Sequence, residues 1–149
     1  MTHRFIFHVP RHWLLCLAGI LWFGVGLLLC GRSVQWSIAA HTPWVLVLDL
    51  LGMILAFVGY TKGFHKVARR NIERVLALEA RAPFYAFTGL RGYAMITLMI
   101  ATGIVLRNSP LDKLYLVLPY MTMGGVLIRG SADYIRRFLE LSKIESRRP

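Results

Sequence analysis

One acidic residue interrupts the apolar stretches of this chain. Asp49 lies inside the apolar run that extends from Trp44 to Thr61, five residues after the run begins. Burying an ionisable side chain among apolar residues costs free energy, so such a residue marks a functional site by default. Two interpretations follow. Asp49 belongs to a proton- or ion-coupled site, or it is a structural acid that pairs with an arginine or contacts water near the surface.

Three further residues are candidates for the same site. Arg32 and Arg107 each stand at the end of an uncharged apolar run, which places them at the same depth as Asp49 if the runs are helices. Pro119 lies inside another apolar run, and interrupted helices line the sites of many transporters. We therefore take Asp49, Arg32, Arg107 and Pro119 as candidate transport or binding residues. Ordinary packing of Pro119 against a neighbouring helix is the alternative.

The other reactive side chains form no catalytic or metal-binding pattern. Cys16 and Cys30 lie too far apart along one apolar run to form a disulfide within it, and neither has a His or Cys neighbour at a metal-ligand spacing. The sequence also lacks a Ser-His-Asp arrangement, a phosphate-binding loop and a pair of carboxylates. We expect no catalytic residue, no metal and no cofactor, and an enzyme is the least favoured class.

The elements that must position these residues are four apolar runs. They cover residues 13–31, 44–61, 92–106 and 114–128. The chain is 56% hydrophobic and its mean hydropathy is +0.55, which is too apolar for an ordinary soluble protein of 149 residues. The sequence therefore predicts an all-α protein with four transmembrane helices, in which the two shorter runs are completed by flanking basic residues that reach the membrane surface.

The positive charge predicts how these helices are oriented. The net charge is +11, and fifteen of the 18 Lys and Arg residues fall in the N-terminal arm, the central loop and the C-terminal tail. An even number of spans places these three segments on one side, which the positive-inside rule assigns to the cytoplasm. We expect a multi-pass protein of the inner (plasma) membrane with both termini cytoplasmic. The charge then faces anionic lipid headgroups, and nucleic acid is not needed as a partner.

The chain carries the pattern [ST]-P-x18-[KR]-G-x5-R-R-x2-E twice, 67 positions apart. It predicts a duplicated helical hairpin with pseudo-twofold symmetry in a single domain, 1–149, with the first copy in 1–80 and the second in 81–149. Gly26 and Gly103 correspond in the first helices of the two copies, at a different offset. Each Arg-Arg-x-x-Glu segment predicts a cytoplasmic helix, and their arginines are candidates for docking lipid or a partner: Arg69, Arg70, Arg136 and Arg137.

Small residues are spaced along the first helix. Gly19, Gly24, Gly26 and Gly31 permit another helix to approach closely, either within the bundle or across a dimer. Because four helices alone enclose little space for a pathway, we expect a homo-oligomer to be possible.

Segment 81–107 resembles the pattern PFW-x-x-F…Y-x-I-M…GI-x-LR of a family of small, uncharacterised bacterial membrane proteins. Tyr85 stands where that pattern has Trp, and segments 10–15 and 18–22 resemble a preceding part of the same family. The resemblance covers roughly half of the chain. It implies a bacterial inner-membrane protein of four helices, and it implies no known activity.

Two functions follow from these patterns. The favoured prediction is a small transporter or channel for an ion or small solute, with its pathway at a hairpin or protomer interface and Asp49, Arg107 and Pro119 as key residues. The alternative is a non-catalytic scaffold or accessory subunit of a membrane complex, which docks a membrane protein partner or anionic lipid through its basic cytoplasmic helices.

Overall fold

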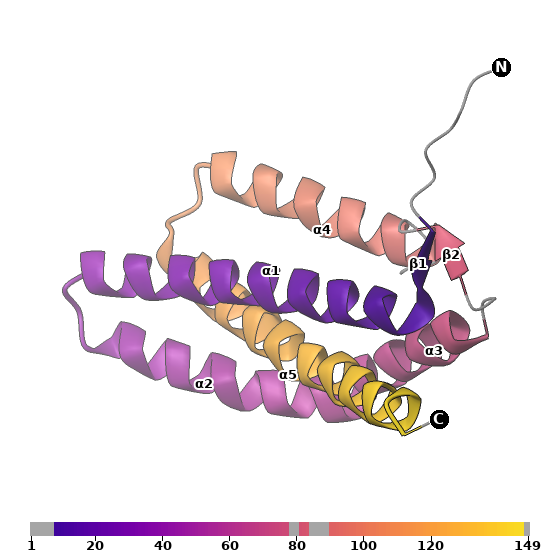
Figure 1. Ribbon diagram of the computed structural model, residues 1–149. Helices are drawn as coiled ribbons and strands as arrows, with labels where there is room; N and C mark the ends of the chain where they lie inside the picture. Colours follow the sequence, from indigo (N-terminus) through magenta and orange to yellow (C-terminus); the bar gives the residue numbers. More distant parts are fainter. Residues whose placement is uncertain (1–7, 78–80, 84–89, 148–149) are drawn as a thin grey trace, which may run out of the picture.

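The computed structural model describes residues 8–77, 81–83 and 90–147, and these residues are mainly helical. The elements in chain order are β1 (His8–Pro10), α1 (Arg11–Ala39), α2 (Trp44–Gly59), the π-helical turn η1 (Tyr60–Phe64), α3 (His65–Leu76), β2 (Arg81–Pro83), α4 (Leu90–Asn108) and α5 (Leu114–Glu145). The turns α1–α2 and α4–α5 lie at one end of the molecule, here called the turn end. The strands, α3 and the end of α5 lie at the other, the α3 end (Figure 1).

Two helices are long and apolar enough to cross a membrane by length and composition. They are His12–Ala39, which is nearly all of α1, and Trp44–Leu76, which joins α2, η1 and α3. Only 33% and 22% of their most apolar windows are buried, so they are not enclosed as the core helices of a soluble protein would be. In α4 a shorter apolar stretch covers Ile96–Asn108.

The core forms where α1 crosses α5, and glycines allow the crossing to be close. A Cβ added at Gly26 would come within 2.8 Å of the Gly124 carbonyl oxygen, and one added at Gly19 within 3.2 Å of Tyr134. Gly24 and Gly31 have no such neighbour within 4 Å in the part of the chain that the structure describes. The predicted close approach along the first helix is therefore made by two of the four glycines, which lie seven residues, or about two helical turns, apart.

The second of these long apolar helices does not end at Gly63. The sequence pattern places its end at Lys62-Gly63, but the chain continues from α2 through η1 into α3. In a π turn the backbone hydrogen bond joins residues i and i+5, so the helix continues but one extra residue is accommodated. The second copy of the pattern has no such turn, and α5 runs unbroken past Gly130.

Two short strands join the N-terminal arm to the chain that follows α3. β1 and β2 pair antiparallel, with His8 opposite Pro83, Val9 opposite Ala82 and Pro10 opposite Arg81. No pattern in the sequence predicts this pairing. At the same end, His12 Nδ1 lies 3.1 Å from Glu145 Oε2, which joins the first turn of α1 to the last turn of α5.

α4 lies beside the other helices rather than in their core (Figure 1). Tyr120 donates a hydrogen bond from its hydroxyl to the Gly103 carbonyl oxygen (3.2 Å), and Ile96 and Met99 pack against the core. α1 has 29 residues and α4 has 19, whereas the helices that follow them, Trp44–Leu76 and α5, have 33 and 32. The predicted division between the two copies falls at residue 80, outside the described residues.

Candidate functional site

Asp49 lies between three helices and is bound by serine hydroxyls. The Ser33 hydroxyl donates a hydrogen bond to Asp49 Oδ1 at 2.7 Å. The Ser37 hydroxyl, one turn later on α1, donates to Asp49 Oδ2 at 2.5 Å. Ser33 also lies 2.9 Å from the Val117 carbonyl oxygen of α5, and Ser37 lies 3.0 Å from the Ser33 carbonyl oxygen. Both serines are buried. The cluster of Asp49, Ser33 and Ser37 therefore connects α1, α2 and α5 close to the turn end.

This cluster uses the two oxygens of Asp49 in different contacts. Each serine has one proton to donate, and each has both a carboxylate oxygen and a backbone oxygen within hydrogen-bond distance. Hydrogen bonds between membrane helices stabilise a bundle by about 1 kcal/mol each. The arrangement can therefore hold three helices together. Each serine hydroxyl can also turn its proton from an Asp49 oxygen to a backbone carbonyl oxygen and back.

The structure does not bring the other sequence candidates to Asp49. Arg32 is exposed and donates a hydrogen bond from Nη1 to Gln35 Oε1 at 3.3 Å. Arg107 is exposed in the last turn of α4. Among the described residues, neither arginine forms an ion pair with Asp49. Pro119 is an exposed residue inside α5, and close to it the backbone oxygen of Leu118 faces Gly52 of α2.

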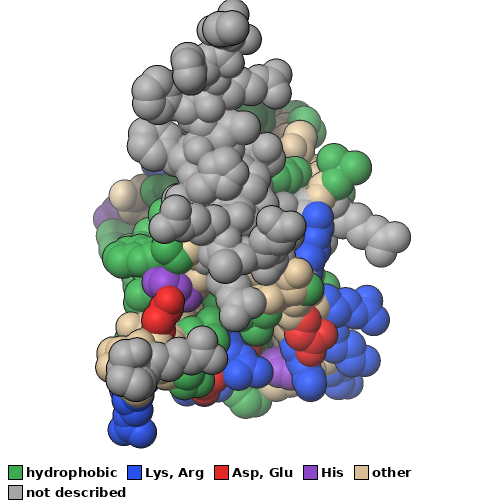
Figure 2. Space-filling model, turned by 45° about the vertical axis from the view of Figure 1, so that its right-hand side comes forward, with side chains coloured by type: hydrophobic (Ala, Val, Ile, Leu, Met, Phe, Trp, Pro, Cys, Tyr) green, Lys and Arg blue, Asp and Glu red, His purple; other side chains and the backbone are tan. Residues whose placement is uncertain are grey.

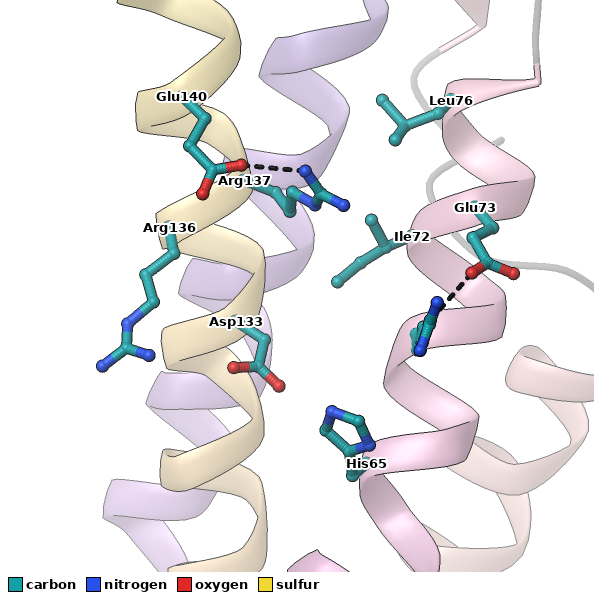
Figure 3. Close-up of a pocket in the computed structure, with 9 residues that line it drawn as sticks. His65, Ile72, Glu73, Leu76, Asp133, Arg136, Arg137 and Glu140 are labelled. Atoms are coloured by element: carbon teal, nitrogen blue, oxygen red, sulfur yellow. Dashed lines mark hydrogen bonds and ion pairs between the residues drawn. The ribbon is translucent and has the colours of Figure 1, made fainter.

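A second polar region lies at the α3 end, where a pocket of about 280 Å³ opens between α3 and α5. In Figure 3 His65, Ile72 and Leu76 extend from α3 toward α5, whereas Glu73 lies along α3 itself. Asp133 and Arg137 extend from α5 toward α3, and Arg136 extends along the outer side of α5. The nine lining residues are His65, Arg69, Ile72, Glu73, Leu76, Asp133, Arg136, Arg137 and Glu140. Both Arg-Arg-x-x-Glu segments thus contribute to one pocket.

Hydrogen bonds and ring contacts hold this end together. Tyr60 donates a hydrogen bond from its hydroxyl to Asp133 Oδ2, the Arg129 guanidinium lies 5.6 Å from the centre of the Tyr60 ring, and His65 meets the same ring edge-on. Further along the helices, Asn71 donates to the Tyr134 hydroxyl at 3.1 Å. Burial raises the pKa of that hydroxyl. η1 supplies Tyr60 and therefore joins the apolar helix α2 to Asp133 of the pocket.

Two of the pocket arginines pair within their own helices. Arg69 Nε lies 2.9 Å from Glu73 Oε1, and Arg137 Nη1 lies 2.9 Å from Glu140 Oε2. Arg136 lines the pocket without an ion pair among the described residues, and Arg70 is exposed outside the pocket. The four predicted docking arginines therefore divide into three that line the pocket and one that does not.

Figure 2 shows Lys and Arg side chains gathered at the α3 end, with acidic side chains between them. The described basic residues on α3 and the α3 end of α5, together with η1, outnumber the acidic ones there. They are Lys62, Lys66, Arg69, Arg70, Arg74, Arg129, Arg136, Arg137, Lys143 and Arg147, against Glu73, Asp133, Glu140 and Glu145.

Sequence reasoning missed Ser33, Ser37, Tyr60 and Asp133. Ser33 and Ser37 are four residues apart in a helix, so both hydroxyls point to one side, and this spacing is the signal that could have identified them as partners of Asp49. Tyr60 and Asp133 come from different copies of the repeat, and no local pattern connects them. The described residues contain no group of three or more His, Cys, Asp and Glu side chains placed to hold a metal ion.

No protein-family model, curated protein or solved structure matches the chain. The resemblance to small bacterial membrane proteins therefore stays a prediction, and functional arguments must come from the two polar regions.

Proposed function

We propose that the protein is a non-catalytic scaffold of the inner membrane, with four helical spans and both termini cytoplasmic, which docks anionic lipid headgroups at its α3 end. One observation carries the proposal. Two basic segments that lie 67 positions apart in the sequence meet at one end of the molecule and line the same pocket. The family resemblance described above is consistent with this reading.

Exposed apolar side chains support the membrane location. Large apolar residues are exposed along α1, α2 and α4, among them Leu28, Leu50 and Leu98. A soluble monomer rarely exposes such extended apolar surface, whereas a lipid environment removes its cost. α4 and α5 complete the proposed set of four spans, because the chain turns between them at the same end as between α1 and α2.

The distribution of charge supports the orientation. Most described Lys and Arg residues lie at the α3 end, and Arg32, Arg107 and Lys113 are the ones near the turn end. Basic residues remain preferentially in the cytoplasm during insertion and are attracted to the anionic inner leaflet by about 1 kcal/mol each.

Lipid analysis of the purified protein tests the proposal. We expect phosphatidylglycerol and other anionic lipids to be enriched in particles extracted with a mild detergent, relative to the bulk membrane. Enrichment should fall when all four docking arginines are changed to glutamine. Unchanged lipid composition between wild type and this variant contradicts the docking role, and a stoichiometric protein partner would make the chain an accessory subunit.

A transporter is the second candidate, and the contacts of Asp49 favour it. An acidic residue with two hydroxyls at 2.5 and 2.7 Å inside an apolar bundle offers a place for a proton or ion. Proteoliposomes containing a pH-sensitive dye separate the two functions. The scaffold predicts no flux above that of empty vesicles, whereas flux in wild type that is lost in Asp49→Asn would establish transport. That the protein forms a homo-oligomer stays a prediction, and the molecular mass of the purified protein in the same preparations tests it.

A further inference from the structure

We infer that the pocket between α3 and α5 holds the phosphodiester group of one anionic phospholipid, with Arg69 and Arg137 binding it from opposite walls. The inference rests on the proposed function and names the chemical group that the docking face recognises. It also gives the repeated Arg-Arg-x-x-Glu pattern a shared purpose, since one arginine from each copy reaches the same ligand.

The shape and lining of the pocket fit such a group. Arg69 and His65 belong to the α3 wall and Arg137 to the α5 wall, while Ile72 and Leu76 supply apolar surface (Figure 3). A volume of about 280 Å³ lies close to the lower end of the ~300–1,000 Å³ of small-ligand pockets, which suits one phosphate and its first carbon substituents. Charged and apolar lining together suit a lipid headgroup with its glycerol.

The pocket lining itself has no excess charge. Arg69, Arg136 and Arg137 balance the carboxylates Glu73, Asp133 and Glu140, because Asp133 keeps its negative charge when it accepts a hydrogen bond from Tyr60. The excess positive charge comes from the residues around the pocket, since the α3 end has ten described Lys and Arg residues against four acidic ones. A singly charged phosphodiester is therefore attracted to this end by its surroundings and binds where arginines of both helices are within reach.

The two existing ion pairs are easily exchanged. Arg69, Glu73, Arg137 and Glu140 are all exposed, and exposed pairs within one helix contribute only about 0.3–0.5 kcal/mol. A guanidinium can bind phosphate with two parallel hydrogen bonds, whereas each of these ion pairs is made by one nitrogen–oxygen contact. The phosphate can thus replace both glutamates without breaking the fold.

The depth of the pocket favours a lipid over a soluble phosphate ester. The apolar run of α2 ends at Thr61, and His65 follows one turn later. On α5, Asp133 follows one turn after Arg129, where the apolar run has ended. The pocket therefore begins where the proposed spans leave the hydrocarbon. Arg69 and Arg137 lie eight residues, or about 12 Å, beyond Thr61 and Arg129, and long arginine side chains can reach back toward the level of the lipid phosphates.

Native mass spectrometry of the full chain in detergent tests the inference. Phosphatidylglycerol and phosphatidylcholine are titrated separately against wild type, the pocket variant Arg69→Gln/Arg137→Gln, and the matched variant Arg70→Gln/Arg74→Gln, which removes the same charge from the exposed side of α3. We expect one phosphatidylglycerol to bind wild type most tightly, and the pocket variant to bind it about tenfold more weakly than the matched variant. Circular dichroism and gel filtration verify folding, and Arg69→Lys/Arg137→Lys should recover part of the affinity.

Each other outcome decides the question. Equal weakening in both double variants overturns the pocket and leaves the proposed docking to diffuse surface charge. Competition by glycerol 3-phosphate at equal concentration overturns the lipid assignment in favour of a soluble phosphate ester. No preference for phosphatidylglycerol in wild type overturns the pocket and the docking function together.

Discussion

The two copies of the repeated pattern bury different faces of the helices that carry their Arg-Arg-x-x-Glu segments. Val67 in the first copy is 43% exposed, whereas its counterpart Tyr134 is 1% exposed. One residue later the relation reverses, since Ala68 is completely buried and its counterpart Ile135 is 37% exposed. The buried positions of the first copy are thus shifted by one residue relative to those of the second, although the sequence pattern has the same spacing in both.

The π turn explains this shift. η1 lies just before α3 and accommodates one extra residue, which rotates the following helix by about 100° relative to an uninterrupted α-helix. The second copy runs through the same position inside α5 without a π turn. Identical spacing in the sequence therefore does not produce equivalent contacts, and each helix presents its arginines to the pocket in its own way.

Glycines at corresponding positions of the first helices give the largest expected difference between the copies. In Gly26→Ala the new Cβ would lie 2.8 Å from the Gly124 carbonyl oxygen, a backbone atom that cannot move alone, so we expect a loss of about 3 kcal/mol. In Gly103→Ala it would meet only the Tyr120 hydroxyl at 3.6 Å, and stability should change by less than about 1 kcal/mol. Thermal unfolding in detergent measures both, and equal losses would show that α4 packs as tightly as α1.

The next largest difference in stability is expected between Gly63 and Gly130, the glycines that follow the first basic residue of each repeated pattern. A Cβ at Gly130 would collide with the Phe64 ring, which also contacts Trp22, so Gly130→Ala should cost about 1–2 kcal/mol. Gly63 has open space around it, so Gly63→Ala should be neutral or stabilise the helix by up to about 1 kcal/mol. The comparison uses unfolding temperatures, and a destabilising Gly63→Ala would contradict the position of η1.

Cysteine labelling examines the one-residue shift directly. A membrane-impermeant maleimide should label Val67→Cys and Ile135→Cys rapidly, because both positions are exposed, and Ala68→Cys slowly, because it is buried. The wild type, whose Cys16 and Cys30 lie in α1, gives the background. If Ala68→Cys and Ile135→Cys were labelled at the same rate, equivalent positions of the two copies would be equally exposed, which would contradict the one-residue shift.

The smallest effect is expected from the two glutamates. Glu73→Gln and Glu140→Gln each remove one exposed ion pair, at spacings of i,i+4 and i,i+3, so each should cost about 0.3–0.5 kcal/mol or less. The same variants should bind phosphatidylglycerol more tightly, because each releases an arginine of the pocket. Urea unfolding of the two variants side by side measures the stability term, and a loss above about 1 kcal/mol in either would indicate a role beyond the ion pair.

Much of the helical architecture could be predicted because it depends on local patterns. The Ser/Thr-Pro pairs predict helix starts, and α2 does begin directly after Pro43, whereas α5 begins at Leu114, four residues after Pro110. The glycines of the first helix indicated close packing, which Gly19 and Gly26 make. η1 could not be predicted, since a π turn has no distinctive composition and depends on what the helix packs against. The β1–β2 pair escaped notice because strands of three residues leave no periodicity to detect.

The candidate sites were predictable only in part. An acid in an apolar run identified Asp49, but its partners are serines, which are common in membrane helices and carry no charge to reveal them. The pairing of Asp49 with an arginine was reasonable from charge alone, yet Arg32 points to Gln35 instead. The repeat identified the two basic segments. Only the tertiary structure shows that they line one pocket, because α3 and α5 pack together in the core.

The pairing of β1 with β2 also bears on the order in which the chain is assembled. His8–Pro10 lies before α1 and Arg81–Pro83 lies after α3. Their pairing therefore closes a ring of chain that contains α1, α2, η1 and α3. A growing polypeptide can close this ring once residue 83 has left the ribosome, before α4 and α5 have packed against the first three helices. The face of α1 that carries Gly19 and Gly26 then waits for α5, the last helix made. We therefore expect the first half of the protein to enter the membrane as a closed but incompletely packed intermediate.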